Sequence, residues 1–139
     1  MAKQRVLILC TGNSARSQMG EGLLRNLAGD RFDVFSAGTR PTSLNPNAIE
    51  AMREIGIDIS GQRSKSVDEF AGEKFDYVIT VCDNARESCP IFPGEARRLH
   101  QGFEDPAAAR SGEQPAKFRQ VRDAMASWVE TFILDEVHS

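Results

Sequence analysis

The chain begins with a short apolar run that ends at a cysteine. Val6–Cys10 (VLILC) is continuous and apolar, and the small polar stretch Thr11–Ser17 follows it. A continuous apolar run of this length is typical of a strand buried on both faces of a sheet. Beyond the polar stretch, Met19, Leu23 and Leu27 recur every four residues, which predicts a helix. The sequence therefore predicts a strand–loop–helix unit with a thiol at the carboxyl end of its strand.

Strands and helices alternate along the rest of the chain. Residues 33–36, 76–82 and 97–100 are predicted strands, the second of them rich in β-branched side chains. Such alternation implies right-handed crossovers and a parallel sheet, hence an α/β fold. Ligands of such folds bind beyond the carboxyl ends of the strands, and Cys10 and Cys82 both lie at such an end.

Capping signals mark where the helices begin and end. Asn45 followed by Pro46 is typical of a helix start, and Gly56 can end that helix in the left-handed conformation. Ser66 and Glu69 have the spacing of a capping box that opens a short helix. Two helices have apolar stripes that we expect to face the core. The helix that starts at Pro46 has Ile49, Met52 and Ile55, and a C-terminal helix has Phe118, Val121, Met125, Trp128, Val129, Phe132 and Ile133.

Length and composition are those of an ordinary globular domain. The chain has 139 residues, 40% of them hydrophobic and 27% charged, which suits one domain spanning residues 1–139. Its net charge of −3 gives no basis for a nucleic-acid-binding surface. The first apolar run is far shorter than the core of a signal peptide, and no stretch approaches the ~20 apolar residues of a membrane span. We therefore expect a cytoplasmic monomer with no nucleic-acid or membrane partner.

The chain has three cysteines, Cys10, Cys82 and Cys89, and two histidines. An odd number of cysteines argues against a framework of structural disulfides. Zinc is not expected, because the sequence has neither a CxxC pair nor an HExxH motif. The simplest alternative to a chemical role is that all three thiols are buried as small apolar side chains.

The polar loop has the residue types of an oxyanion-binding site. Successive backbone N–H groups in a tight turn form an anion-binding nest, and the following helix directs its N-terminal dipole to the same place. The Arg16 guanidinium can hold two oxygens of a tetrahedral anion. The same donors favour the thiolate of Cys10, which would be a nucleophile aimed at the anion's central atom, with Ser17 donating to the sulfur. The alternative is a polar turn with an incidental thiol. The expected oxyanion-binding residues are Thr11, Gly12, Asn13, Ser14, Ala15, Arg16 and Ser17.

The sequence CTGNSARS resembles the signature loop shared by low-molecular-weight protein tyrosine phosphatases and thioredoxin-coupled arsenate reductases. Five further segments are similar to the reductase branch, in the same order: SAGT, NPNAIEAMREIGIDIS, DYVITVCDNARESCP, GFEDPA and FRQVRDAM. The resemblance implies a three-layer fold with a four-stranded parallel sheet of order 2-1-3-4 and helices on both faces. In that order the first and third strands are neighbours, so Cys10 and Cys82 would lie close together.

Two departures from the phosphatase pattern favour the reductase. The phosphatase branch carries methionine at the position of Cys82 and proline at the position of Gln18. A phosphatase needs one cysteine, an arginine and a general acid, whereas a reductase must supply two electrons, for which paired thiols are a local source. The alternatives are a low-molecular-weight tyrosine phosphatase and a non-enzymatic module that binds an oxyanion or senses redox state. Asp105 with Arg16 argues against the module, because a sensor needs no proton donor.

The resemblance also implies a reaction scheme. The Cys10 thiolate attacks the arsenic of arsenate while Asp105 supplies a proton to the leaving water. Asp105-Pro106 alone would read as a turn, with Glu104 as a rival acid; the match to GFEDPA favours Asp105. Cys82 and then Cys89 pass on the oxidation as a disulfide, which thioredoxin reduces as external donor, with no tightly bound cofactor. Some related enzymes use glutathione and glutaredoxin instead, and phosphate or sulfate should compete with arsenate.

The spacing of the second and third cysteines predicts movement. Cys82 and Cys89 are seven residues apart and would lie about 10 Å from each other in a helix. A disulfide needs Cα atoms within roughly 7 Å. We therefore expect residues 82–93 to rearrange when the protein is oxidised.

A cation site is a further implication of the resemblance. Some relatives bind a potassium ion beside the loop through an asparagine, a glutamate, a serine and an aspartate. Asn13, Glu21 and Ser36 match the first three positions, whereas Lys65 stands at the aspartate position. Our hypothesis is that the Lys65 ammonium takes the place of potassium and steadies Glu21 and Asn13, so that no metal is bound. The alternative is a solvated surface lysine.

Overall fold

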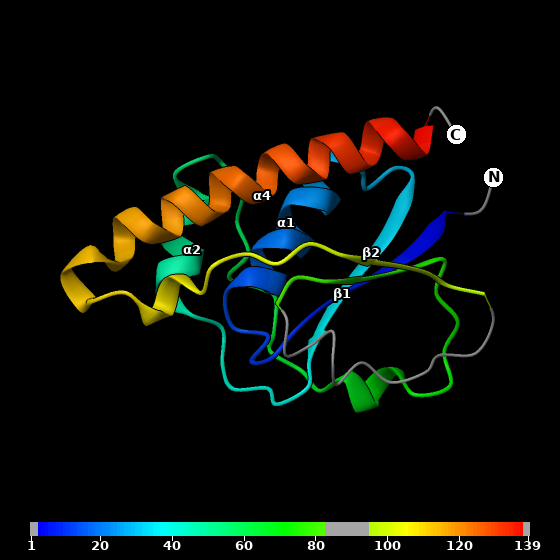
Figure 1. Ribbon diagram of the computed structural model, residues 1–139, viewed down its shortest axis with the longest axis horizontal. Coiled ribbons are helices and arrows are strands. Elements are labelled where there is room, and N and C mark those ends of the chain that lie inside the picture. The colour runs from blue at the N-terminus through cyan, green and yellow to red at the C-terminus, as the bar shows by residue number, and fades with distance from the viewer. Residues whose placement is uncertain (1–2, 83–94, 138–139) are drawn as a thin grey trace.

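A four-stranded, entirely parallel sheet forms the centre of the protein (Figure 1). The computed structural model describes residues 3–82 and 95–137. The strand order is β2-β1-β3-β4, which confirms the α/β fold and the expected order 2-1-3-4. The strands are β1 (Gln4–Cys10), β2 (Phe32–Gly38), β3 (Tyr77–Thr80) and β4 (Arg97–His100).

β1 and β3 are neighbours, and this brings the two cysteines of the described chain to one edge of the sheet. Leu9 pairs with Thr80, the last residue of β3. The chain stays attached to β1 for one residue more, because the backbone N–H of Val81 donates to the Leu9 carbonyl at 2.9 Å. Cys10 ends β1, and Cys82 follows directly after this last ladder contact. β3 is therefore shorter than the predicted 76–82.

Two helices, α1 and α4, cover one face of the sheet, and a short helix lies against the other (Figure 1). α2 packs against α1 and α4, and η1 lies on the second face, next to Phe35. No helix of the described residues is long and apolar enough to span a membrane. The helices are α1 (Arg16–Ala28), α2 (Pro46–Arg53), α4 (Gln114–Val137) and the 3-10 helices η1 (Val67–Phe70), η2 (Pro106–Ala108) and η3 (Ser111–Glu113).

The apolar stripe of the C-terminal helix faces the core, as predicted. Phe132 contacts Phe32 of β2 and Tyr77 of β3 with ring centroids 5.7 and 5.2 Å apart, and Trp128 stacks on it. Six of the seven stripe residues are buried, and Trp128 is half-buried. Because α4 crosses the strands in this way, it fixes the sheet against which α1 and its preceding loop are held.

Two local expectations were wrong. Ile55, which we expected to face the core, is 42% exposed, because it lies beyond the end of α2. The capping box is incomplete: Ser66 accepts from the backbone N–H of Asp68, but Glu69 binds the Arg63 guanidinium instead of reaching back. The tight 3-10 turn that follows Ser66 is only four residues long.

The capping signals around α2 are confirmed. The Asn45 side chain accepts from the backbone N–H of Asn47 at 2.8 Å, and Pro46 is the first residue of the helix. Gly56 has φ +82°, the left-handed conformation expected after this helix. α2 begins after the segment that follows β2 has passed the loop between β1 and α1, and the backbone N–H of Asn45 donates to the Ser14 carbonyl of that loop at 2.9 Å.

Candidate active site

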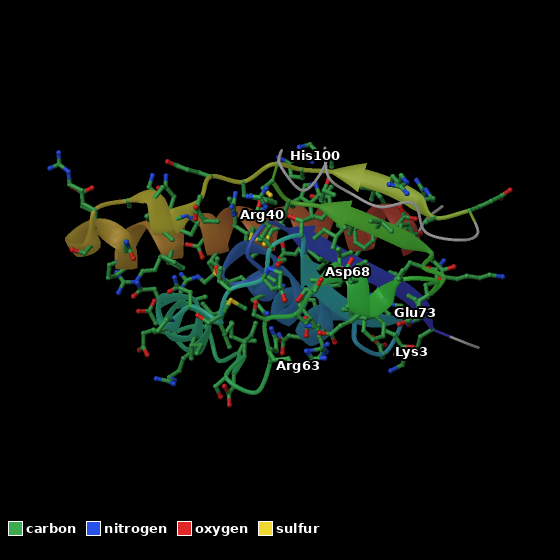
Figure 2. The ribbon with its side chains drawn as sticks, turned by 90° about the horizontal axis from the view of Figure 1, so that it is seen from below. Lys3, Arg40, Arg63, Asp68, Glu73 and His100 are labelled. Carbon is green, nitrogen blue, oxygen red and sulfur yellow. The ribbon has the colours of Figure 1, made fainter. Side chains whose placement is uncertain are left out.

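The loop between β1 and α1 has its carbonyl groups tied to the chain that follows β2. The N–H groups of Arg40, Thr42 and Asn45 donate to the carbonyls of Thr11, Gly12 and Ser14 at 2.8, 3.0 and 2.9 Å. In a trans peptide the C=O bond and the N–H bond of the next residue point in opposite directions. Anchoring these carbonyls therefore turns the N–H groups that follow them to the other side of the loop. This arrangement gives the nest of donors that an oxyanion needs. Figure 2 shows Arg40 near the carboxyl ends of the strands, whereas Lys3 and Glu73 lie near their amino ends.

Close approach of backbone to backbone shapes the loop. Asn13 has φ +47°, and asparagine is among the few residues besides glycine that adopt the left-handed region readily. Gly38, the last residue of β2, lies so near that a Cβ there would be 2.5 Å from the Thr11 carbonyl oxygen and 2.9 Å from the Asn13 nitrogen. The glycine therefore lets the loop rest directly on the end of β2.

The Cys10 sulfur is held at the centre of this loop and is almost wholly buried, with 2% of the residue exposed. The backbone N–H of Asn13 donates to Cys10 Sγ at 3.2 Å, and the Ser17 hydroxyl lies 2.9 Å from the same atom. Ser17 Oγ accepts from Asn13 Nδ2 at 2.7 Å, so its own hydrogen is available to the sulfur. Donors to a thiolate stabilise the nucleophilic form of cysteine. The predicted role of Ser17 thus fits the geometry.

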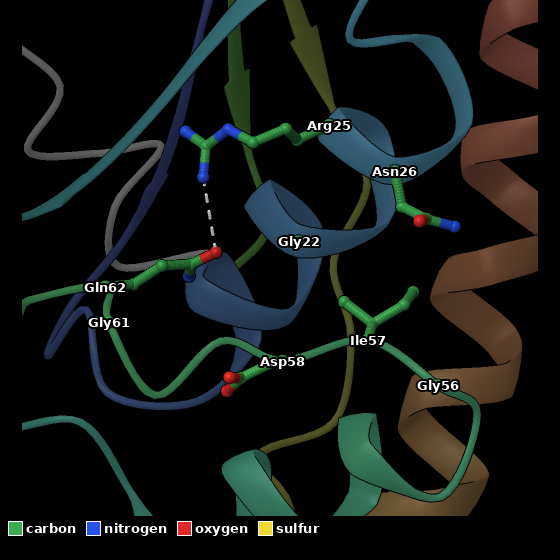
Figure 3. A pocket seen from close by; sticks show the side chains of 8 residues that line it. All are labelled: Gly22, Arg25, Asn26, Gly56, Ile57, Asp58, Gly61 and Gln62. Atoms are coloured by element: carbon green, nitrogen blue, oxygen red, sulfur yellow. Dashed lines mark hydrogen bonds between the residues drawn. The ribbon is translucent and has the colours of Figure 1, made fainter.

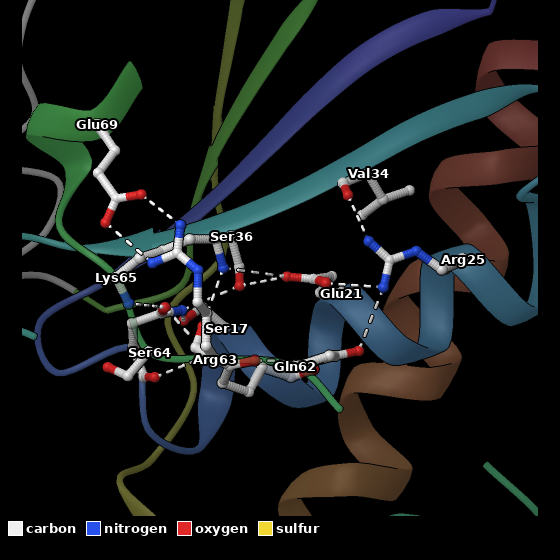
Figure 4. Close-up of polar contacts among 12 residues, drawn as sticks. Ser17, Glu21, Arg25, Val34, Ser36, Gln62, Arg63, Ser64, Lys65 and Glu69 are labelled. Atoms are coloured by element: carbon white, nitrogen blue, oxygen red, sulfur yellow. Dashed lines mark hydrogen bonds and ion pairs between the residues drawn. The ribbon is translucent and has the colours of Figure 1, made fainter. Parts of the chain in front are cut away.

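Behind the loop lies a buried polar chain that ends on a carboxylate (Figure 4). The second Nδ2 hydrogen of Asn13 reaches Ser36 Oγ at 3.0 Å, and Ser36 donates to Glu21 Oε1 at 2.5 Å. Lys65 Nζ lies 3.8 Å from the same carboxylate oxygen, and Arg25 Nη1 lies 2.7 Å from the other one. Burial lowers the pKa of Lys65 below its ordinary value, and the Glu21 charge partly opposes that effect.

Gln18 is a part of the site that the sequence reasoning used only as a family marker. Its side chain is fully buried, and Nε2 donates to the Asn13 carbonyl and to Asn13 Oδ1, both at 3.0 Å. The same nitrogen reaches the Arg63 carbonyl at 2.9 Å, and Gln62 Nε2 donates to Gln18 Oε1 at 2.7 Å. Gln18 therefore holds Asn13 in its left-handed conformation. A glutamine in the first turn of the predicted helix was the only signal for this role.

Arg16, the first residue of α1, connects the loop to the segment that carries the predicted acid. Its Nη1 donates to the Phe103 carbonyl at 3.1 Å, and its Nη2 lies 3.9 Å from Asp105 Oδ2. Asp105 Oδ1 caps η2 by accepting from the backbone N–H of Ala107. The rival acid Glu104 is paired with Lys117 at 3.1 Å. The structure thus brings Asp105, and not Glu104, to the arginine of the loop.

Cys82 is buried, 5% exposed, and lies beside the loop: the hydroxyl of Thr11 is 3.3 Å from its sulfur. The residue that follows Cys10 therefore contacts Cys82 directly. Cys89 and most of the segment 82–93 lie outside the described residues.

The residues matched to a potassium site do not fit a bound cation. Asn13, Glu21 and Ser36 are brought together, but the Lys65 ammonium stands at the carboxylate where a metal ion would be held. Lys65 is no solvated surface lysine, because only 11% of its side chain is exposed.

A separate pocket of about 560 Å³ opens on the outer side of α1 (Figure 3). Arg25 and Gln62 meet across it at 3.4 Å. It lies behind the loop between β1 and α1, to which Gln62 is connected through Gln18. Its wall is formed by Gly22, Arg25, Asn26, Gly56, Ile57, Asp58, Gly61 and Gln62.

Comparison with known proteins agrees with the geometry. Residues 5–138 match the family model described as low molecular weight phosphotyrosine protein phosphatase. An arsenate reductase of Oceanobacillus iheyensis is 46% identical over 134 residues, which are 95% of this chain and 96% of that protein. A solved arsenate reductase in its phosphate-binding state is 32% identical with a TM-score of 0.78, covering 95% of this chain and 98% of that one. A thioredoxin-dependent arsenate reductase of Corynebacterium glutamicum is 27% identical with a TM-score of 0.69, covering 96% of this chain and 63% of that one.

Proposed function

Since the chain belongs to the low molecular weight phosphotyrosine protein phosphatase family, within the branch of its arsenate reductase relatives, we propose that it reduces arsenate to arsenite. The observation that carries the proposal is a second buried thiol, Cys82, beside the oxyanion loop that holds Cys10. A phosphatase has no use for that thiol. The phosphatase alternative is not favoured, because relatives such as that of O. iheyensis are arsenate reductases.

The first step uses the groups that converge on the loop. Arsenate binds to the N–H groups of residues 11–17 and to the Arg16 guanidinium, as phosphate and sulfate would in competition. The Cys10 thiolate attacks arsenic, and a hydroxyl of arsenate leaves as water with a proton from Asp105. The 3.9 Å approach of Arg16 Nη2 to Asp105 supports this assignment, because one side chain then orients both the anion and the acid.

The second step moves two electrons from sulfur to arsenic. Cys82 attacks the Cys10 sulfur, the arsenic–sulfur bond breaks with its electron pair on arsenic, and arsenite leaves with a Cys10–Cys82 disulfide behind. The Thr11 hydroxyl, 3.3 Å from Cys82 Sγ, supports this step as a donor to the attacking thiolate. Cys89 then attacks Cys82, frees Cys10 and forms a Cys82–Cys89 disulfide.

Thioredoxin is the proposed external reductant of that last disulfide, and no tightly bound cofactor is needed. The similarity to the thioredoxin-dependent enzyme of C. glutamicum supports this choice over glutaredoxin. Because thioredoxin-type systems keep thiols reduced in the cytosol, we place the reaction in the cytoplasm.

The test is arsenite release by wild type, Cys82→Ser and Cys89→Ser, with and without thioredoxin, thioredoxin reductase and NADPH. In the proposed scheme arsenite leaves when Cys82 attacks. Cys89→Ser should therefore release one equivalent per enzyme and then stop, and Cys82→Ser should release none. Only wild type should oxidise NADPH continuously.

The controls separate the alternatives. Replacing thioredoxin by glutathione and glutaredoxin tests the donor. Hydrolysis of p-nitrophenyl phosphate that survives in Cys82→Ser and Cys89→Ser, together with no arsenite release by wild type, would establish a phosphatase instead.

A further inference from the structure

We propose that the Lys65 ammonium is the permanent cation of the oxyanion loop, a positioning residue that balances the buried charge of Glu21 and thereby orients the hydrogen bonds to Cys10. The inference deepens the proposed function, because it concerns the loop that would bind arsenate. It replaces the potassium ion that the family resemblance implies at this place.

Donor and acceptor counting gives the chain of hydrogen bonds a direction. The Asn13 amide has two N–H donors, and they go to the hydroxyls of Ser17 and Ser36. Each hydroxyl then has one hydrogen left, and each points at an acceptor: Ser36 at the Glu21 carboxylate, and Ser17 at the Cys10 sulfur. The network thus directs one hydroxyl hydrogen to the Glu21 carboxylate and the other to the Cys10 sulfur, where it stabilises a thiolate.

One end of this network is the buried carboxylate of Glu21. Glu21 Oε1 accepts the Ser36 hydrogen at 2.5 Å, and the same Ser36 oxygen accepts from the Asn13 amide at 3.0 Å. Glu21 is only 6% exposed, and a carboxylate buried to that extent needs compensating charge. The network therefore depends on a cation close to Glu21.

Lys65 is the buried source of that charge. Its Nζ lies 3.8 Å from Glu21 Oε1, the oxygen that Ser36 binds, and a hydrogen bond of 3.0 Å to the Arg63 carbonyl fixes its position (Figure 4). Arg25 pairs with the other carboxylate oxygen but is 49% exposed, so solvent screens its charge more strongly.

The same residue also holds the loop through its backbone. The N–H of Lys65 donates to Asn13 Oδ1 at 3.0 Å, and its carbonyl accepts from the N–H of Gly38 at 2.9 Å. Backbone and side chain of one residue therefore fix Asn13 and Glu21, the middle and the end of the network. A covalently attached cation is always present, so the loop needs no monovalent metal ion.

The experiment measures the affinity for inorganic phosphate by calorimetry, at fixed ionic strength, in sodium and in potassium salts. Lys65→Met removes the charge with little change in length, Lys65→Arg keeps it, and Lys74→Met changes an exposed lysine as a matched control. We expect wild type to bind phosphate equally in both salts. Lys65→Met should bind about tenfold more weakly, while Lys65→Arg and Lys74→Met stay close to wild type.

Three results would overturn the inference: a wild-type affinity that rises when potassium replaces sodium, unchanged binding by Lys65→Met, or an equal loss in Lys65→Arg. Thermal melting checks that each variant folds. If Lys65→Met does not fold, the comparison of salts with wild type still decides. Phosphate binding needs no arsenate turnover, so failure of the proposed reductase activity and failure of this inference are distinguishable.

Discussion

Gly38→Ala tests whether the contact between the end of β2 and the oxyanion loop is as close as the structure has it. The added Cβ would lie 2.5 Å from the Thr11 carbonyl oxygen, against 3.4 Å for an ordinary contact, a shortfall of 0.9 Å (3.4 − 2.5). The two nearest atoms, the Thr11 carbonyl oxygen and the Asn13 nitrogen at 2.9 Å, both belong to the backbone. No side-chain rotation can therefore relieve the contact. The Thr11 carbonyl also accepts from the N–H of Arg40 at 2.8 Å, and the loop cannot retreat without weakening that bond.

The steric overlap and the weakened hydrogen bond together set the loss of stability in Gly38→Ala. Overpacking by one methyl group costs about 1–3 kcal/mol, and a weakened backbone hydrogen bond adds about 1 kcal/mol. Together they reduce the free energy of unfolding by about 2–4 kcal/mol, which lowers the Tm of a domain of this size by about 6–16 °C. Because the displaced peptide carries an N–H of the anion nest, the affinity for phosphate should also fall, by about tenfold or more.

Urea unfolding, thermal melting and phosphate calorimetry measure these effects, with Gly112→Ala as the matched control. A Cβ at Gly112 meets nothing within 4 Å, so this variant should unfold and bind phosphate like wild type. If Gly38→Ala has the stability and phosphate affinity of Gly112→Ala, the loop does not rest on β2 as described.

Three further predictions concern the acid, the support of the loop and the single tyrosine. Asp105→Asn should lower arsenate turnover about 100-fold or more in the coupled assay while phosphate affinity stays near that of wild type, and undiminished turnover would exclude Asp105 as the acid. Gln18→Leu leaves the buried Asn13 carbonyl without its Gln18 donor, while Asn13 Oδ1 keeps only the Lys65 N–H, and urea unfolding should show a loss of about 1–3 kcal/mol; a stable variant would contradict the bracing role. Burial, with a hydrogen bond to Glu136, raises the pKa of Tyr77 above its ordinary value near 10. The neutral phenol therefore stabilises the fold fully below about pH 10, and this contribution is lost as the pH rises through the higher folded value. Tyr77 is the only tyrosine, so phenolate absorbance should titrate at higher pH in the native than in the urea-unfolded protein, and coincident curves would refute the shift.

Short-range patterns were enough to predict the class of fold and the place of the nucleophile. The apolar run Val6–Cys10, the small polar loop and the helix after it are fixed by neighbouring residues, because burial on both faces of a strand and the start of a helix leave local signatures. The cap at Asn45 and the left-handed Gly56 were predicted for the same reason. The ends of helices were predicted less well, as the exposed Ile55 shows. Tertiary packing, and not the apolar pattern alone, decides which residue of a helix is the last to be buried.

The polar surroundings of the loop were decided by the tertiary structure. Phe103 supplies a carbonyl to Arg16 from 87 residues away, and Gln18 meets Gln62 across 44 residues. Neither contact leaves a periodic or capping pattern in the sequence, because it exists only after the crossovers have brought separate segments to one edge of the sheet. Lys65 is the sharpest example. By its sequence it could be a solvated side chain, and only the folded protein places its ammonium beside the buried carboxylate of Glu21.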